Sequence, residues 1–165
     1  MSKILEHLMK PSTTVVFDVD GVLAAYEFGE LNHCGCQDEY WEDFCKGNNP
    51  YDKAKPIPQI EKFIKAKGRN HIYVCSVAKD YERINKTAFC MREYGISRDH
   101  IFFVDNASEK QAVLEKIEEM EGKKQINIAL VEDTVTTLNQ LYTETDFCTV
   151  HVSSFFFFDK KEKEH

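Results

Sequence analysis

Short apolar segments recur along the chain, and segments with the periodicity of amphipathic helices separate them. The apolar segments are residues 13–17, "HIYVCS" (71–76), "HIFFVD" (100–105), "INIALVED" (126–133) and "DFCTVHV" (146–152). They lack the polar alternation of a half-exposed strand, and this is typical of strands that are buried on both faces of a parallel sheet. The sequence therefore predicts an α/β fold in which helices cover both faces of a mostly parallel sheet.

Four segments between or after the predicted strands carry apolar residues at helical spacing. Residues 54–68 are the first of them, and Gly68 is the expected C-terminal cap. In the other three, the residues that we expect to face inward are Tyr81, Ile84, Ala88 and Met91; then Val113, Leu114, Ile117 and Met120; and then Val135, Leu138, Leu141 and Tyr142.

Residues 27–55 interrupt the alternation after the first strand. Because this segment is too long for an ordinary connection, we interpret it as a small insertion over one end of the sheet, within a single domain of residues 1–165. Its aromatic residues either form the insertion's own small core or contact an aromatic leaving group such as a nucleobase; they are Tyr26, Phe28, Tyr40, Trp41 and Phe44. A zinc site is a further alternative, although its spacing matches no strong zinc pattern; the residues would be His33, Cys34, Cys36 and Cys45.

Four consecutive phenylalanines, Phe155–Phe158, precede a charged stretch at the end of the sequence. They could extend the last strand, pack against the helix predicted in residues 54–68, or form a contact in a homodimer. The charged residues after them are expected to be a solvated end.

The charge and the hydropathy pattern exclude several classes of protein. A formal net charge of −7 argues against a general binder of nucleic-acid polymers or anionic membranes. No apolar stretch approaches the length that crosses a bilayer, and residues 1–12 lack the apolar core of a signal peptide. We therefore expect a cytoplasmic protein whose six cysteines are reduced thiols.

Polar residues follow the carboxyl ends of the predicted strands. In an open parallel sheet these ends meet at one edge, where ligands bind. Four carboxylates, a hydroxyl and an ammonium are therefore expected to share one cleft; they belong to Asp18, Asp20, Glu132, Asp133, Ser76 and Lys110, with Asn106 in the loop before Lys110. Such a carboxylate cluster requires a cation, and an all-oxygen site with room for phosphate suits Mg²⁺.

Lys110 is a separate indication of an anion at this edge. Ser108 and Gln111 have the spacing of a capping box, which predicts a helix start at Ser108. A lysine in the first turn opposes the helix dipole. Either Lys110 is an ordinary surface lysine, or it is positioned to meet an anion, and the nearby carboxylates favour the second interpretation.

The ordered motifs resemble those of the haloacid dehalogenase (HAD) superfamily, a group dominated by Mg²⁺-dependent phosphatases. "VVFDVDGVL" is similar to the first motif, "IYVCS" to the second, "SEKQAVL" to the third and "IALVEDT" to the fourth. The resemblance covers residues 13–150 and implies a Rossmann-like, three-layer fold. It also makes the insertion at residues 27–55 a small cap, the place where members of this family often hold their specificity.

The resemblance implies a role for each residue of the first motif. Asp18 would be the nucleophile that forms an aspartyl-phosphate, and Asp20 would be the general acid and then the general base. Gly21 would let backbone amides approach the phosphate closely.

The other motifs would complete the site. Ser76 would hydrogen-bond a phosphoryl oxygen, and Lys110 would offset the charge shared by nucleophile and phosphate. Mg²⁺ would be held by the Asp18 carboxylate, the Asp20 carbonyl and Asp133, with Glu132 assisting through water.

The resulting hypothesis is a Mg²⁺-dependent phosphohydrolase that acts on a phosphomonoester, a nucleotide or another small metabolite. A phosphoryl transferase or mutase of the same fold is the alternative among enzymes. A non-catalytic phosphate-binding or interaction protein is the alternative outside them, although such a protein has no need for the proton transfer of Asp20.

Overall fold

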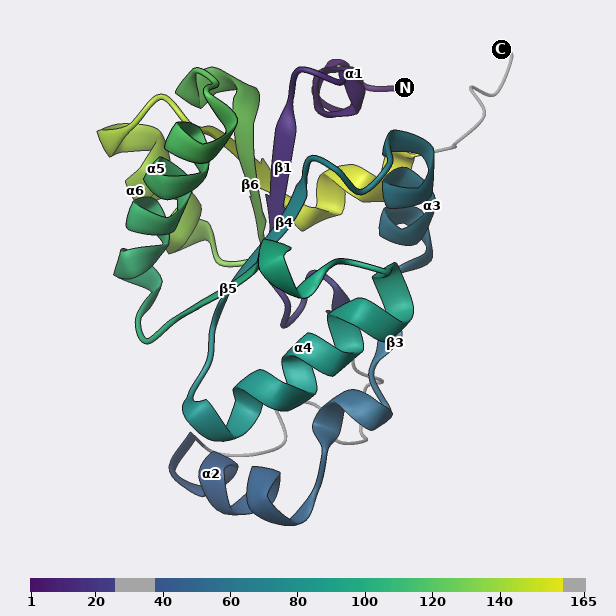
Figure 1. The fold of residues 1–165 in the computed structure, drawn as a ribbon, viewed down its shortest axis with the longest axis vertical. Coiled ribbons are helices and arrows are strands. Elements are labelled where there is room, and N and C mark those ends of the chain that lie inside the picture. Colours follow the sequence, from purple (N-terminus) through teal and green to yellow (C-terminus); the bar gives the residue numbers. More distant parts are fainter. Residues whose placement is uncertain (26–37, 159–165) are drawn as a thin grey trace.

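The computed structural model describes residues 1–25 and 38–158 of the chain (Figure 1). Its central sheet has five parallel strands in the order β5–β4–β1–β6–β7. These strands are β1 (Thr14–Phe17), β4 (Ile72–Val77), β5 (Ile101–Val104), β6 (Ile128–Glu132) and β7 (Cys148–His151). The prediction of an α/β fold with a parallel sheet is confirmed.

Helices cover both faces of the sheet, as a three-layer sandwich requires (Figure 1). One layer contains α1 (Lys3–Met9), α3 (Pro58–Lys67) and α4 (Asp80–Tyr94), and the other contains α5 (Lys110–Glu121) and α6 (Val135–Glu144). Single 3-10 turns lie at Pro50–Asp52, Arg98–His100, Ala107–Glu109 and Gln125–Asn127, and a longer one at Val152–Phe157. The sequence reading did not predict α1, which buries Leu5 and Leu8 against the core.

β1 is the middle strand of the sheet and is buried on both faces, which explains why its sequence has no polar alternation. Val15 and Phe17 belong to the core beneath α1, α3 and α4, whereas Val16 belongs to the core beneath α5 and α6. All three side chains are fully buried. Because β1 pairs with β4 on one side and β6 on the other, its carboxyl end lies at the point where the connections diverge, which is where open α/β sheets bind ligands.

Two short antiparallel strands, β2 (Ala24–Ala25) and β3 (Lys55–Pro56), bracket the segment predicted to be an insertion. Between them, α2 (Asp38–Gly47) packs against α4. The predictions for Tyr26, Phe28, His33, Cys34 and Cys36 lie outside the described residues. The remaining residue of the proposed zinc set, Cys45, is buried in α2.

The prediction of which face of α4 (Asp80–Tyr94) points inward was wrong. Ile84 is 80% exposed, and Ala88 and Met91 are exposed as well. The buried face instead carries two charged side chains together with three less polar ones; these residues are Glu82, Lys86, Phe89, Cys90 and Tyr94. Apolar periodicity failed here because the two charged residues are paired with other groups, and this pairing makes their burial tolerable.

Smaller errors of the same kind affect α5 and α6. Met120 is exposed in α5, and Val135 and Tyr142 are exposed in α6. The predicted capping box of Ser108 and Gln111 is also replaced, because Asn106 and Glu109 form one around a 3-10 turn and α5 follows this turn.

The phenylalanine run packs against α3, which was one of the three predicted alternatives. The Phe155 ring lies 5.1 Å from that of Phe63 and 5.6 Å from that of Phe17, and Phe158 also contacts Phe63. The run lies in a 3-10 turn and does not extend β7. Within residues 1–25 and 38–158, no helix has the length and apolar character that a bilayer crossing requires.

Candidate active site

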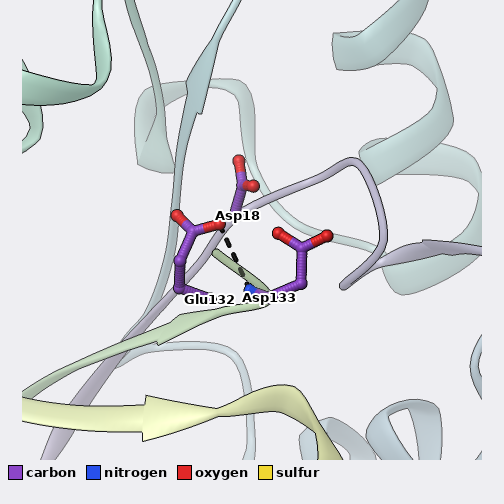
Figure 2. Close-up of side chains that lie close together, drawn as sticks. All are labelled: Asp18, Glu132 and Asp133. Atoms are coloured by element: carbon purple, nitrogen blue, oxygen red, sulfur yellow. Dashed lines mark hydrogen bonds between the residues drawn. The ribbon is translucent and has the colours of Figure 1, made fainter. Parts of the chain in front are cut away.

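Three carboxylates gather at the carboxyl ends of β1 and β6. Asp18 follows β1, Glu132 ends β6, and Asp133 comes directly after it. Each offers an oxygen within 4.8 Å of the other two, and Figure 2 shows the side chains projecting to the same side of the sheet edge. Asp18 and Glu132 are buried, whereas Asp133 is exposed to solvent.

Lys110, at the start of α5, lies against the two buried carboxylates. Its Nζ is 2.5 Å from Glu132 Oε2 and 3.3 Å from Asp18 Oδ1, and only 3% of the residue is exposed. Burial alone would lower the pKa of Lys110, but the charges of Asp18 and Glu132 outweigh it and raise the pKa. Lys110 is therefore a buried cation aimed at the end of β1, and not the ordinary surface lysine of the alternative interpretation.

Glu132 experiences the opposite balance. Its burial, assisted by the charge of Asp18, raises its pKa to about 8 despite the contact with Lys110. Its Oε1 accepts hydrogen bonds from the backbone amides of Asp133 and Thr134, at 3.2 and 3.4 Å. Glu132 therefore holds the loop that carries Asp133, and a further positive charge at the cluster would stabilise its ionised form.

Gly21 makes room for Asp133. It has φ +74°, and a Cβ built on it would lie 2.3 Å from Asp133 Oδ2. Its own amide donates to the Ala24 carbonyl at 3.1 Å, within the turn after Asp20. The lack of a side chain at this position thus allows the carboxylate of Asp133 to approach the turn.

The cluster fits a hard divalent cation. Three carboxylates lie close together, and the ammonium of Lys110 pairs with two of them. Carboxylate oxygens are ligands that Mg²⁺ prefers. Asp18, Glu132 and Asp133 are the described residues whose side chains could hold such an ion.

Asp20 points away from this cluster, toward α4 and the segment between β2 and β3. Its Oδ1 accepts a hydrogen bond from the Tyr51 hydroxyl at 2.8 Å, and its Oδ2 accepts one from Lys86 Nζ at 2.7 Å. Tyr51 lies in the 3-10 turn Pro50–Asp52. The two aspartates of the first motif therefore have different partners, although one residue separates them.

Ser76 lies beside Lys86, the lysine that also contacts Asp20. It is 1% exposed near the end of β4, and its hydroxyl accepts a hydrogen bond from Lys86 Nζ at 3.3 Å. The nearby Asn106 instead caps the turn before α5, and it is not among the described residues that line the cleft.

A cleft of about 940 Å³ joins these groups. All seven residues predicted for the site line it: Asp18, Asp20, Gly21, Ser76, Lys110, Glu132 and Asp133. It is also lined by Trp41, one of the aromatic residues considered for contact with a leaving group, and by residues that were not predicted for the site, among them Lys79, Glu82 and Lys86. A cleft of this volume is in the range of small-molecule sites.

Lys86 and Tyr51 are the functional candidates that sequence reasoning missed. The one available signal was the pairing of Glu82 with Lys86 at helical spacing, on the same turns as Phe89 and Cys90. This signal was weaker than the more apolar face of the same helix, around Ile84 and Met91, which is exposed in the structure. Tyr51 had no signal, because its contact with Asp20 depends on how a long connection returns to the sheet.

The chain matches no protein-family model, and no curated protein matches it significantly. Among solved structures it is similar to DsGPDH of Dunaliella salina, with a TM-score of 0.55 and 18% sequence identity over 88% of this chain. The chain spans only 24% of that protein's length. It is also similar to the HAD domain of the effector protein Lem4 from Legionella pneumophila, with a TM-score of 0.47 and 13% identity, covering 87% of this chain and 91% of that one.

At these identities the likeness concerns the fold alone. The structure has the arrangement that the sequence resemblance implied. β1 is central, the motif residues line one cleft at the strand ends, and a segment is inserted directly after the first motif. The fold is a Rossmann-like, three-layer α/β fold with a five-stranded parallel sheet. The activity of the chain has to be argued from its own residues.

Proposed function

We propose that the chain is a Mg²⁺-dependent phosphohydrolase that cleaves a phosphomonoester through an aspartyl-phosphate intermediate. The observation that carries this proposal is the position of Asp18, a buried carboxylate at the end of the central strand, 3.3 Å from the ammonium of Lys110. A carboxylate held in this way is oriented by the ammonium and open to the cleft.

In the first step, an oxygen of Asp18 attacks the phosphorus atom, and the bond between phosphorus and the leaving oxygen breaks. Asp20, in its protonated form, gives its proton to that oxygen. Lys110 would offset the negative charge that Asp18 and the phosphoryl group bring together, and the hydroxyl of Ser76 would donate to a phosphoryl oxygen.

In the second step, Asp20 acts as a base. Its carboxylate removes a proton from a water molecule, the water oxygen attacks phosphorus, and the bond to Asp18 breaks to release inorganic phosphate. Both carboxylates then return to their starting protonation states, so that the cycle balances.

The cluster of Asp18, Glu132 and Asp133, with the backbone carbonyl of Asp20, would hold Mg²⁺. When bound, the ion neutralises charge on the phosphoryl oxygens. Glu132 would become fully ionised, and Gly21 would keep Asp133 in place.

The substrate class follows from the cleft and from its charges. Lys110 together with a bound Mg²⁺ would favour a phosphate, while the lining by Trp41, Ile57 and Tyr81 offers apolar contact to the rest of a small molecule. The proposed substrate is therefore a small phosphomonoester, and the net charge of −7 does not favour a nucleic-acid polymer.

Release of inorganic phosphate tests the proposal. The assay uses a panel of nucleoside monophosphates, sugar phosphates and aryl phosphates with Mg²⁺, and repeats it after addition of EDTA. We expect hydrolysis of at least one class, its loss in EDTA and its return with excess Mg²⁺. Activity that is unchanged by EDTA, or no hydrolysis of any member by folded protein, would contradict the proposal.

A further inference from the structure

Lys86 is a buried cation for which the four motifs provide no role. Only 1% of the residue is exposed, although it lines the cleft. A lysine is almost never buried to this extent unless it is paired. The groups around Lys86 should therefore explain why it is buried.

All three N–H bonds of the Lys86 ammonium have acceptors in this structure. Nζ donates to Asp20 Oδ2 at 2.7 Å, to the Val77 carbonyl at 2.7 Å and to Ser76 Oγ at 3.3 Å. An ammonium has three donors, so its hydrogen-bonding capacity is satisfied. Lys86 therefore acts on groups of the protein, whereas Lys110 faces the nucleophile.

Tyr51 holds the other oxygen of Asp20. Its hydroxyl donates to Oδ1 at 2.8 Å, and its ring lies 5.9 Å from Lys86 Nζ. The Tyr51 carbonyl in turn accepts a hydrogen bond from Arg92 of α4 at 3.1 Å. Two donors from different segments thus fix both oxygens of one carboxylate, which leaves little rotational freedom for Asp20.

Glu82 supports this arrangement from the preceding turn of α4. Its Oε1 lies 3.9 Å from Lys86 Nζ and accepts a hydrogen bond from the Trp41 indole at 2.8 Å. Its Oε2 accepts one from the Lys79 amide at 2.8 Å. The same helix face therefore anchors α2 through Trp41 and orients Lys86 toward the sheet.

We propose that Lys86, assisted by Tyr51, is a positioning residue that holds the Asp20 carboxylate where the leaving oxygen departs. This inference rests on the proposed function and adds a residue to it from outside the motifs. In this arrangement Lys86 also orients the hydroxyl of Ser76, because a hydroxyl that accepts from an ammonium presents its own proton elsewhere. The alternative is that the ion pair of Lys86 and Asp20 only stabilises the packing of α4 against the sheet.

The dependence on the leaving group separates the two roles. Phenyl phosphate needs a proton on its leaving oxygen, whereas 2,4-dinitrophenyl phosphate leaves without one and has a ring of similar shape. The value of kcat/KM reports the steps up to the first irreversible one, which here is departure of the leaving group. Misplacement of Asp20 should therefore lower kcat/KM for phenyl phosphate far more than for the dinitrophenyl ester.

We expect Lys86→Met to lower kcat/KM for phenyl phosphate about 100-fold and that for 2,4-dinitrophenyl phosphate less than about 5-fold, since general acid catalysis contributes on the order of 10²–10⁴. Tyr51→Phe keeps the buried ring and removes only the hydroxyl, so we expect the same selectivity at about 5- to 10-fold. Lys123→Met is the matched control, because Lys123 is a partly buried lysine that pairs with Glu121 and Thr14 at the amino end of β1; both substrates should be unaffected.

Equal losses on both esters in Lys86→Met and Tyr51→Phe would overturn the positioning role and support the merely structural one. If circular dichroism shows that Lys86→Met is unfolded, the Tyr51→Phe result decides alone. Failure of the wild-type protein to hydrolyse either ester with Mg²⁺, together with no hydrolysis across the wider panel, would overturn the proposed function and the positioning role with it. Wild-type activity without leaving-group selectivity in the variants would overturn only the latter.

Discussion

The cleft has two halves that the chain builds in different ways. The strand half consists of residues directly after β1, at the start of α5, and at and just after the end of β6; they are Asp18, Lys110, Glu132 and Asp133. The helix half consists of Asp20, Tyr51, Ser76 and Lys86, and its cation comes from the middle of α4. Each half places a buried lysine on one aspartate of the first motif. In the proposed mechanism the strand half carries out the attack on phosphorus, and the helix half carries out the proton transfer.

The largest expected effect concerns the strand half. Asp18→Asn removes the nucleophile while keeping the shape of the side chain, and we expect phosphate release to fall by at least about 10³-fold with little change in stability. Phosphate release under saturating substrate measures it. Asp105→Asn is the control, since Asp105 follows the edge strand β5, pairs with Arg83 and is not among the described residues that line the cleft. Wild-type rates in Asp18→Asn would remove Asp18 from the mechanism.

A second prediction separates metal binding from backbone strain. Gly21→Ala combines an unfavourable positive φ with a Cβ that would displace Asp133, so we expect the Mg²⁺ concentration for half-maximal activity to rise about 10- to 100-fold. Gly122→Ala introduces a comparable strain at φ +61°, with no atom within 4 Å of the new Cβ. It should lose stability by about 1 kcal/mol and keep the metal requirement. Equal shifts in metal requirement for the two variants would contradict the role of Gly21.

A third prediction concerns pH and the buried Glu132. Its pKa in the folded state is raised to about 8, above the roughly 4.3 of a free side chain. The stability that the protonated form contributes is therefore complete below about pH 4 and is lost as the pH rises through about 8. In EDTA, the melting temperature of wild type should fall by about 3 °C or more relative to Glu132→Gln between pH 6 and pH 9.

Mg²⁺ should reduce this pH-dependent difference, because a cation stabilises the ionised carboxylate. Glu39→Gln, on the exposed surface of α2, controls for the change in net charge. A difference between wild type and Glu132→Gln that stays constant from pH 6 to pH 9 would show that Glu132 does not carry the raised pKa.

The smallest expected effect compares how readily two elements beneath the cleft open, helix α4, which carries Lys86, and strand β4 of the sheet. Burial raises the pKa of the Cys75 thiol in β4 and of the Cys90 thiol in α4 to about 12, so neither should react with iodoacetamide in the native protein at pH 8. Slow labelling reports local opening, and helix α4 should open before strand β4, which is paired on both sides in the sheet. Peptide mapping should find Cys90 labelled several times faster than Cys75, and the reverse order would contradict the expectation that α4 is less stable than the sheet.

The two halves also differ in how well the sequence predicted them. Asp18, Glu132 and Asp133 each follow a recognisable apolar strand, and parallel strands bring their carboxyl ends to one edge whatever the details of packing. Lys86 lies in a helix whose more apolar face, around Ile84 and Met91, is the exposed one. Its burial depends on Asp20, far away in the sequence, and periodicity cannot register such a partner.

The rest of the fold shows the same distinction. The strands and the position of Gly68 after α3 were predictable because they follow from local patterns. The packing of Phe155 on Phe63 remained one alternative among three, and the contact between Tyr51 and Asp20 could not be foreseen. Both contacts join segments whose approach is determined by the tertiary structure.

The most direct test of the account is to locate the phosphoryl group during turnover. In Asp20→Asn the second step lacks its base, so an intermediate should accumulate when the variant is mixed with Mg²⁺ and 2,4-dinitrophenyl phosphate, an ester whose leaving group needs no acid. After an acid quench, peptide mass mapping should place the added phosphoryl group on Asp18. Turnover with the phosphoryl group on another residue, or wild-type turnover with no phosphoryl group on Asp18 in either protein, would contradict the account.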